Sequence, residues 1–148
     1  MHALSPEQYA RLGQLAEGWT RRYLRDAKRE PGYNPRLAAD ALCFQRHVDG
    51  ELGHQLVGAL VTPTSLWLVA VPADAPGPAP EPGGTVWLRL PSGEYPLEAV
   101  ALGEALWCRR LVLLDDLSDV TSRQAASRLA QRLMERVMAG GLPDGGSA

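Results

Sequence analysis

The feature that most constrains the fold is an apolar stretch at residues 56–71, which is interrupted in its middle by Thr62-Pro63-Thr64-Ser65. Each half has a typical strand length and falls far short of the roughly 18 apolar residues that a membrane-spanning helix needs. Proline lacks the N–H that a helix or strand would use, so it marks a turn between the halves. The pattern predicts two buried strands, at 56–61 and 66–71, joined by a tight turn.

A further strand is expected before this pair, at residues 41–46. Alternation within it places Leu42 and Phe44 on one face. The Asp49-Gly50 dipeptide that follows is a common turn signal, so the chain is expected to reverse there.

Three more strands are expected after the pair, at residues 86–90, 95–100 and 106–114. The sequence 91–94, Pro-Ser-Gly-Glu, predicts a hairpin turn between the first two of them. Pro96 places the second of these strands at an edge of the sheet, because a proline cannot donate to a neighbouring strand.

An amphipathic helix is expected at each end of the chain. Ser5-Pro6-Glu7-Gln8 is typical of a helix start, in which Ser5 caps the helix and Gln8 completes a capping box. Thr121 is expected to cap the second helix, which Gly140-Gly141 ends. The order of helix, about five or six strands, and helix predicts an α+β fold, with both helices packed on one face of an antiparallel sheet.

Length and composition fit one globular domain. The chain has 148 residues, of which 45% are apolar and 22% charged, and a net charge of -2. A single α+β domain is expected over residues 1–140, with an exposed proline-rich loop at 72–84 and a flexible tail at 141–148. The acidic balance argues against nucleic acid as a partner. With no leader pattern and no spanning segment, a cytoplasmic location without stable membrane insertion is expected.

The sequence offers no strong metal site. Cys43, His47, Glu51 and His54 lie close together, but their spacing matches no zinc pattern. We expect a buried cysteine and two surface histidines instead. No metal ion or other cofactor is expected.

Nucleophilic catalysis has one weak candidate. Cys108 could act with His54 as its base and with Asp115 or Asp116 as the orienting group. However, Cys108 falls inside an apolar strand, where nothing lowers the pKa of its thiol. We therefore assign no catalytic residue and expect no enzyme, and a Cys108-dependent enzyme is the least favoured alternative.

Two surface features stand out. The chain has four tryptophans and one phenylalanine. Tryptophan is frequent at binding hot spots, so at least one is expected to be exposed near a groove, with core packing as the default for the rest. The pair Arg21-Arg22 precedes a charged segment, so it is either a solvated helix face or a docking patch for an acidic partner.

Two segments carry a resemblance to a known family. Residues 57–63, Val-Gly-Ala-Leu-Val-Thr-Pro, and residues 88–95, Leu-Arg-Leu-Pro-Ser-Gly-Glu-Tyr, resemble motifs of the HybE-type NiFe-hydrogenase assembly chaperones. Asn34-Pro35 and the alanine-rich last helix also lie where that family places them, so the resemblance covers about residues 34–139. The chain departs from the family at Thr64, where an aromatic residue is usual. It has too few cysteines for the rubredoxin domain that some relatives carry.

The resemblance implies a cytoplasmic assembly and maturation chaperone. Such a protein binds the hydrogenase large subunit, the signal-bearing small-subunit precursor, or both, and holds them until cofactor insertion and twin-arginine export. A small acidic secretion chaperone or adaptor for another client is the alternative. Oligomeric state and the identity of the bound subunit stay open.

The same resemblance implies a client surface. It would be formed around Gly58, Thr62, Pro63, Trp67, Pro91, Gly93 and Glu94. Gly58 and Gly93 would shape the backbone, Trp67 would supply apolar contact, and Glu94 would meet a basic client segment. Plain turn and packing roles for Gly58, Pro63 and Gly93 are equally compatible with the sequence.

Overall fold

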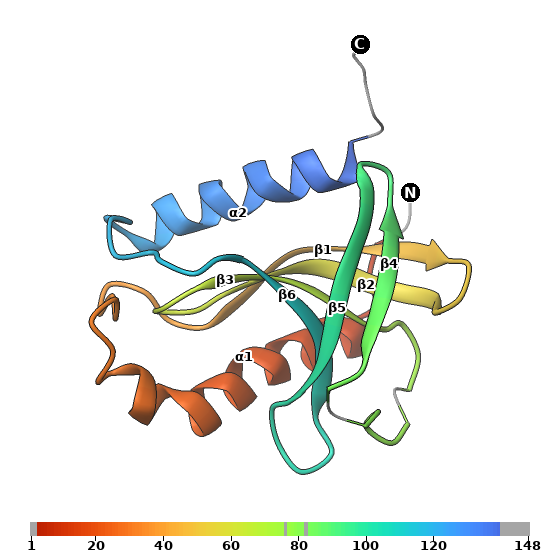
Figure 1. The fold of residues 1–148 in the computed structure, drawn as a ribbon, viewed down its shortest axis with the longest axis horizontal. Helices are drawn as coiled ribbons and strands as arrows, with labels where there is room; N and C mark the ends of the chain where they lie inside the picture. Colours follow the sequence, from red (N-terminus) through yellow and green to blue (C-terminus); the bar gives the residue numbers. More distant parts are fainter. Residues whose placement is uncertain (1–2, 76, 82, 140–148) are drawn as a thin grey trace.

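The computed structural model describes residues 3–75, 77–81 and 83–139. Within them the chain forms a six-stranded antiparallel sheet in the order β1-β2-β3-β6-β5-β4, with one helix on each side (Figure 1). The α+β class and the strand number are as predicted. The elements are α1 (Pro6–Ala27), β1 (Asp40–Asp49), β2 (Gly53–Val61), β3 (Leu66–Pro72), β4 (Thr85–Leu90), β5 (Gly93–Ala101), β6 (Trp107–Leu114) and α2 (Arg123–Met138). None of the helices described is both long and apolar enough to cross a membrane.

The two helices cover opposite faces of the sheet, so the prediction that both pack on one face is wrong. Leu56 and Leu60 of β2 pack in the cluster under α1, whereas Val57 and Ala59 pack in the cluster under α2. Successive side chains of a strand point to opposite faces. A strand that is apolar at every position therefore needs cover on both sides, and each helix supplies one side.

Strand β1 contains a bulge at Cys43. Leu42 pairs with Ala59 and Gln45 pairs with Val57, so β1 has one residue more than β2 over this stretch. Cys43 has a φ of 61°, which is the left-handed region. The extra residue shifts the alternation, so Leu42 packs on the α2 side and Phe44 on the α1 side. The prediction of one shared face is therefore wrong, and Cys43 is exposed where a buried cysteine was expected.

The edge strand of the second half of the sheet is β4. The sequence predicted instead that the strand containing Pro96, which is β5, lies at the edge. The β5–β6 ladder pairs only Glu98–Ala101 of β5 with β6. Pro96 lies beyond that ladder, so its missing N–H breaks no bond to β6. An internal strand can therefore carry this proline.

Asp49 links the β1–β2 turn to the β4 edge. Its carboxylate accepts N–H bonds from Glu51 and Leu52 in the turn and from Arg89 in β4, each 3.0 Å long. Burial acts to raise the pKa of Asp49, but these three donors outweigh it and lower that pKa below its ordinary value. The His47 Nε2–H donates to the Arg89 carbonyl at 2.7 Å, which ties β1 to β4 a second time.

Both helices begin at a side-chain cap. Ser5 and Gln8 form the predicted capping box at α1. The cap of α2 is Ser122, whose side chain accepts from the Ala125 N–H, so the prediction of Thr121 is wrong by one residue. Either hydroxyl can cap, and the local sequence does not decide which of two neighbours is used.

Asn34 joins three loops at one end of the sheet. Its buried side-chain amide donates to the carbonyls of Leu117 and Val120, at 2.9 and 2.8 Å. Its backbone N–H donates to the Pro63 carbonyl at 2.9 Å. The Asn-Pro and Thr-Pro segments therefore meet in space and hold the β2–β3 turn against the loop that precedes α2.

The connection between β3 and β4 is irregular over its described residues, 73–75, 77–81 and 83–84, and most of these side chains are exposed. The tail predicted at residues 141–148 lies outside the described residues.

Candidate partner-binding surface

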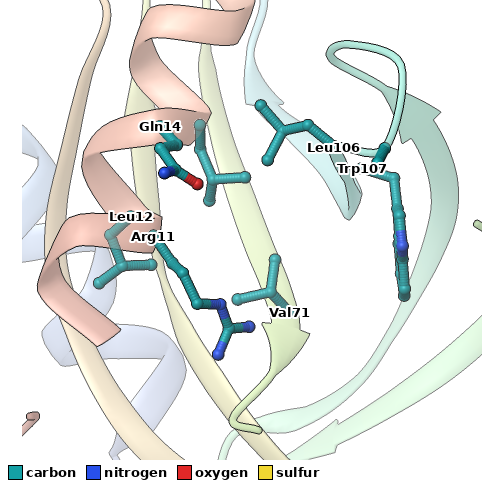
Figure 2. Close-up of a pocket in the computed structure, with 8 residues that line it drawn as sticks. Arg11, Leu12, Gln14, Val71, Leu106 and Trp107 are labelled. Atoms are coloured by element: carbon teal, nitrogen blue, oxygen red, sulfur yellow. The ribbon is translucent and has the colours of Figure 1, made fainter. Parts of the chain in front are cut away.

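A cavity lies between the first half of α1 and the ends of β3 and β6. Its volume is about 150 Å³. Figure 2 shows that the helix contributes Arg11, Leu12 and Gln14 to it, and that these lie across from Val71, Leu106 and Trp107. The Arg11 guanidinium donates to the Ala73 carbonyl at 2.9 Å and also to the Pro72 carbonyl. This cation is thus already used to fix α1 on the end of β3, and the rest of the cavity wall is mostly apolar.

A second hollow, the helix groove, lies under the last turns of α1. It has a volume of about 190 Å³ and is lined by Trp19, Tyr23, Asp26, Ala27, Glu30, Thr64, Ser65, Trp67 and Arg110. Trp67 is 4% exposed and donates from Nε1 to the Ser65 hydroxyl at 2.8 Å. The Arg110 guanidinium stacks on the Trp67 ring, 4.4 Å from its centroid. Such cation–π stacking holds the arginine flat against the sheet.

A third hollow, the sheet groove, continues from Arg110 over β5 and β4. It has a volume of about 270 Å³ and is lined by Thr85, Pro96, Leu97, Glu98, Arg110, Leu111 and Val112. Arg110 pairs across the sheet with Val69 of the α1-side cluster, so the groove lies on the face that α1 covers elsewhere. Figure 1 shows β4 and β5 extending past α1, which leaves this part of the face open.

Apolar side chains border the sheet groove and are exposed. Trp87 pairs with Pro96 across β4 and β5, and Trp87 and Val112 are 58% and 37% exposed. Arg110 donates from Nε and Nη2 to Glu98 Oε1, at 3.2 and 3.0 Å, beside them. Exposed tryptophan with a well-fixed arginine is the composition of an interface hot spot. The prediction that at least one tryptophan is exposed near a groove is confirmed.

The comparisons with known proteins agree with this fold. A family model described as NiFe-hydrogenase assembly, chaperone, HybE matches residues 10–142. The chain belongs to the HybE family of NiFe-hydrogenase assembly chaperones. The resemblance inferred from the sequence motifs is thereby confirmed. The solution structure of HybE from Escherichia coli is similar with a TM-score of 0.58 over 77% of this chain and 71% of that chain, at 20% identity, which shows a common fold. A search of curated protein sequences finds no match.

The Thr-Pro segment of this HybE-family chain forms a buried turn. Thr62 is fully buried, and its hydroxyl accepts from the backbone N–H groups of Thr64 and Ser65, at 3.2 and 2.9 Å. Pro63 is buried as well and accepts from Asn34. Both residues therefore stabilise the turn that carries one wall of the helix groove.

Gly58 lies in the middle of β2, under the ring of Phe44. A Cβ added at Gly58 would lie 2.8 Å from the Phe44 Cα, closer than carbon atoms pack. Only glycine therefore lets β1 and its bulge approach β2 here. Gly58 is therefore buried within its own chain and is not available to a client.

The remaining predicted residues lie in the β4–β5 hairpin, next to the end of α2 (Figure 1). The hairpin residue Ser92 donates from its N–H and its hydroxyl to the Val137 carbonyl, at 3.3 and 2.8 Å. Gly93 has a φ of +149°, which L-residues rarely adopt, so it is needed for the turn. Glu94 lies on the Trp87 face and pairs with Arg89 at 3.2 Å. The structure thus brings Trp67 to the helix groove, leaves Glu94 exposed in the hairpin outside the lining of both grooves, and places Pro91 and Gly93 at the turn.

The sequence did not assign Pro96, Arg110 or Val112 to a surface groove, and it did not predict which tryptophan is exposed. One signal was available for Trp87. In residues 86–90 the apolar Val86, Leu88 and Leu90 alternate with Trp87 and Arg89, so Trp87 shares the face of a charged residue. Period-2 alternation of this kind predicts an outward side chain.

The geometry does not support Cys108 as a nucleophile. Its side chain is fully buried in the α1-side cluster, and that burial raises the pKa of the thiol to about 12 against the opposing charge of Arg110. His54, the proposed base, is exposed at the start of β2. A buried thiol that stays protonated cannot attack a substrate near neutral pH.

In the described parts of the chain, no three His, Cys, Asp or Glu side chains come close enough to hold a metal ion. His47 is only half-buried, and it is held by the Arg89 carbonyl.

Proposed function

We propose that this chain is a cytoplasmic chaperone that holds NiFe-hydrogenase subunit precursors until cofactor insertion and twin-arginine export, and that it binds them on the sheet groove. Membership of the HybE family supports the assembly role. The binding mode is supported by the exposed Trp87 and Val112 and the half-buried Pro96, which lie along that groove.

The observation that carries the binding mode is the exposure of Trp87. A side chain of this size that is 58% exposed keeps a large apolar area in water. Covering it with a partner stabilises the complex by about 2 kcal/mol. This binding free energy is large enough to contribute to capture of a client and small enough to let the client dissociate, as a holding role requires.

Two ion pairs flank Trp87, and their charges would orient a bound client on this surface. Glu94 and Arg89 form an exposed cross-strand pair on one side of Trp87, and Glu98 and Arg110 form a second pair on the other side. We propose that Glu94 meets a basic segment of the client, for which an exposed carboxylate is suited. Trp67 contributes indirectly in this proposal, because its ring holds Arg110 in place.

The test is an affinity pull-down of the tagged chain from hydrogenase-expressing cells of its native host, with mass spectrometry of the bound proteins. We expect recovery of a hydrogenase large subunit or of a small-subunit precursor. The identity of the recovered subunit decides which one is held. Recovery of an unrelated exported protein, or of no protein at all, would refute the proposed function and favour a generic adaptor.

A matched pair of variants tests the surface. Trp87→Ala should reduce the recovered hydrogenase subunit by about tenfold or more, because it removes a hot-spot side chain. Tyr9→Ala is the control, since Tyr9 is an aromatic residue that is 60% exposed on α1 and lies outside both grooves. If both variants capture the subunit as well as the unchanged chain does, the sheet groove is not the client surface.

A further inference from the structure

The exposed side of α1 carries an unusual concentration of positive charge. Between residues 21 and 29 there are five cations and one carboxylate, a net charge of +4 in a chain whose total is -2. We call these five exposed residues the basic ridge: Arg21, Arg22, Arg25, Lys28 and Arg29. At 100° per residue, Arg21, Arg22 and Arg25 occupy an arc of about 100° on the helix, away from its buried Trp19 and Ala27. Lys28 and Arg29 follow directly after the last helical residue.

Folding of the helix does not require this many cations. One or two positive side chains in the last turn suffice to complement the helix dipole. Like charges spaced by four residues within a helix, as in Arg21 with Arg25, destabilise an isolated helix. The ion pairs found in the described residues are Arg89–Glu94 and Arg110–Glu98, and neither uses the ridge. Within the described residues, the ridge cations are thus left without an ion-pair partner.

We propose that the basic ridge docks an acidic segment of a partner protein, a stretch with several Asp or Glu side chains. This surface lies outside the sheet groove, so the inference goes beyond the proposed function. Four of the five cations are arginines, whose planar guanidinium groups bind carboxylates through paired hydrogen bonds. Complementary charge is therefore the basis of recognition.

The surroundings of the basic ridge favour a peptide as its partner over a lipid surface or a nucleic acid. None of the large exposed apolar side chains, which are Tyr9, Val48, Trp87 and Val112, lies within the ridge, so it offers nothing to insert into a bilayer. The net charge of the chain, -2, argues against a nucleic acid as the partner.

The helix groove gives the peptide a second contact. Arg22 of the ridge lies 5.7 Å from the centroid of the Tyr23 ring, and Tyr23 and Trp19 line the groove. An apolar side chain that follows the acidic stretch can enter there. Charge and aromatic surface then act on the same peptide.

The test uses a fluorescein-labelled dodecapeptide of Glu and Asp with one Leu, and fluorescence anisotropy with the full chain. We expect binding that weakens at least about tenfold between about 50 mM and 500 mM salt, because the screening length falls from about 14 Å to about 4 Å. A peptide with Gln and Asn in place of the acids should bind at least about tenfold more weakly. Equal binding of the two peptides would overturn the proposal.

Charge reversal locates the site. Arg22→Glu combined with Arg25→Glu and Arg29→Glu should raise the peptide Kd by about tenfold or more, with the helix content checked by circular dichroism. The matched control reverses three exposed arginines of α2, on the opposite face of the sheet: Arg128, Arg132 and Arg136. Equal losses in both triple variants would overturn the proposal.

Further outcomes separate the other surfaces and partners. Peptide binding must persist in Trp87→Ala, since the ridge and the sheet groove are separate. If Trp87→Ala abolishes it, the peptide occupies the sheet groove and the ridge is not its site. Tighter binding of phosphatidylserine vesicles or of a thymidine dodecamer than of the peptide would likewise refute a protein partner.

Discussion

Two glycines of α1 provide a test of how the helix is seated. A Cβ added at Gly18 would lie 2.7 Å from the Leu102 carbonyl oxygen and 2.6 Å from Leu106 Cδ2, both in or beside the loop between β5 and β6. A Cβ added at Gly13, five residues earlier on the same helix, would meet nothing within 4 Å. The same substitution by alanine is therefore expected to have opposite effects at the two positions.

The magnitudes follow from two opposing contributions. Alanine favours a helix interior over glycine by about 0.8–1 kcal/mol, and this gain applies at both positions. At Gly18 the leucine side chain can rotate away, but a backbone carbonyl cannot, so α1 or the loop must shift. Such overpacking costs about 1–3 kcal/mol. Gly13→Ala should thus raise the free energy of unfolding by about 0.5–1 kcal/mol, and Gly18→Ala should lower it by up to about 2 kcal/mol.

The assay is urea unfolding of both variants, followed by circular dichroism, together with thermal scans. For a chain of this size the two Tm values should differ by about 5–10 °C, with the unchanged protein between them. If Gly18→Ala stabilises the protein as much as Gly13→Ala does, α1 does not approach the β5–β6 loop as closely as the structure shows. The walls of both hollows under α1 would then need to be reassigned.

Three further predictions concern buried polar groups and thiols. Asn34→Ala should lower the free energy of unfolding by about 2–4 kcal/mol, because two buried carbonyls lose their donor; a loss below about 0.5 kcal/mol in urea unfolding would contradict that role. A thiol reagent at neutral pH should label Cys43 in the folded protein and reach Cys108 only in denaturant, since Cys108 is fully buried with a pKa raised to about 12; two rapid labels per folded chain would argue against this packing. Asp49 has a lowered pKa, so its charged form stabilises the fold above pH about 4, and this contribution is lost as the pH falls through the folded-state pKa. The stability difference between the unchanged protein and Asp49→Asn should therefore shrink between pH 5 and about pH 3 in urea titrations, and a difference that grows over that range would be inconsistent with it.

Local sequence signals predicted most elements of the fold. The Ser5 capping box, the Thr-Pro turn and the β4–β5 hairpin each depend on residues within a few positions of one another. Where local chemistry allows two solutions, the prediction failed, as with Thr121 and Ser122 at the start of α2. The bulge at Cys43 was also missed, because no glycine marks the left-handed residue.

The proposed binding surface was only partly predictable. The sequence resemblance led to Trp67, which lines the helix groove, and to Glu94, which is exposed and pairs with Arg89. It also led to Gly58 and Thr62, whose surroundings show that they stabilise the sheet and its turn. A sequence motif does not distinguish residues that shape a turn from residues that contact a partner. Only their exposure in the structure distinguishes the two roles.

By itself, the sequence determined the helices, the strands, the α+β class and the family, because each rests on periodicity, capping or a contiguous motif. The tertiary structure alone decided which face each helix covers and where the open surface lies. The order β3-β6-β5-β4 brings Arg110 beside Trp67 and beside Glu98, and the reach of α1 leaves Trp87 uncovered. These contacts join residues tens of positions apart, and their pairing is set by the packing of the whole core, which no local pattern encodes.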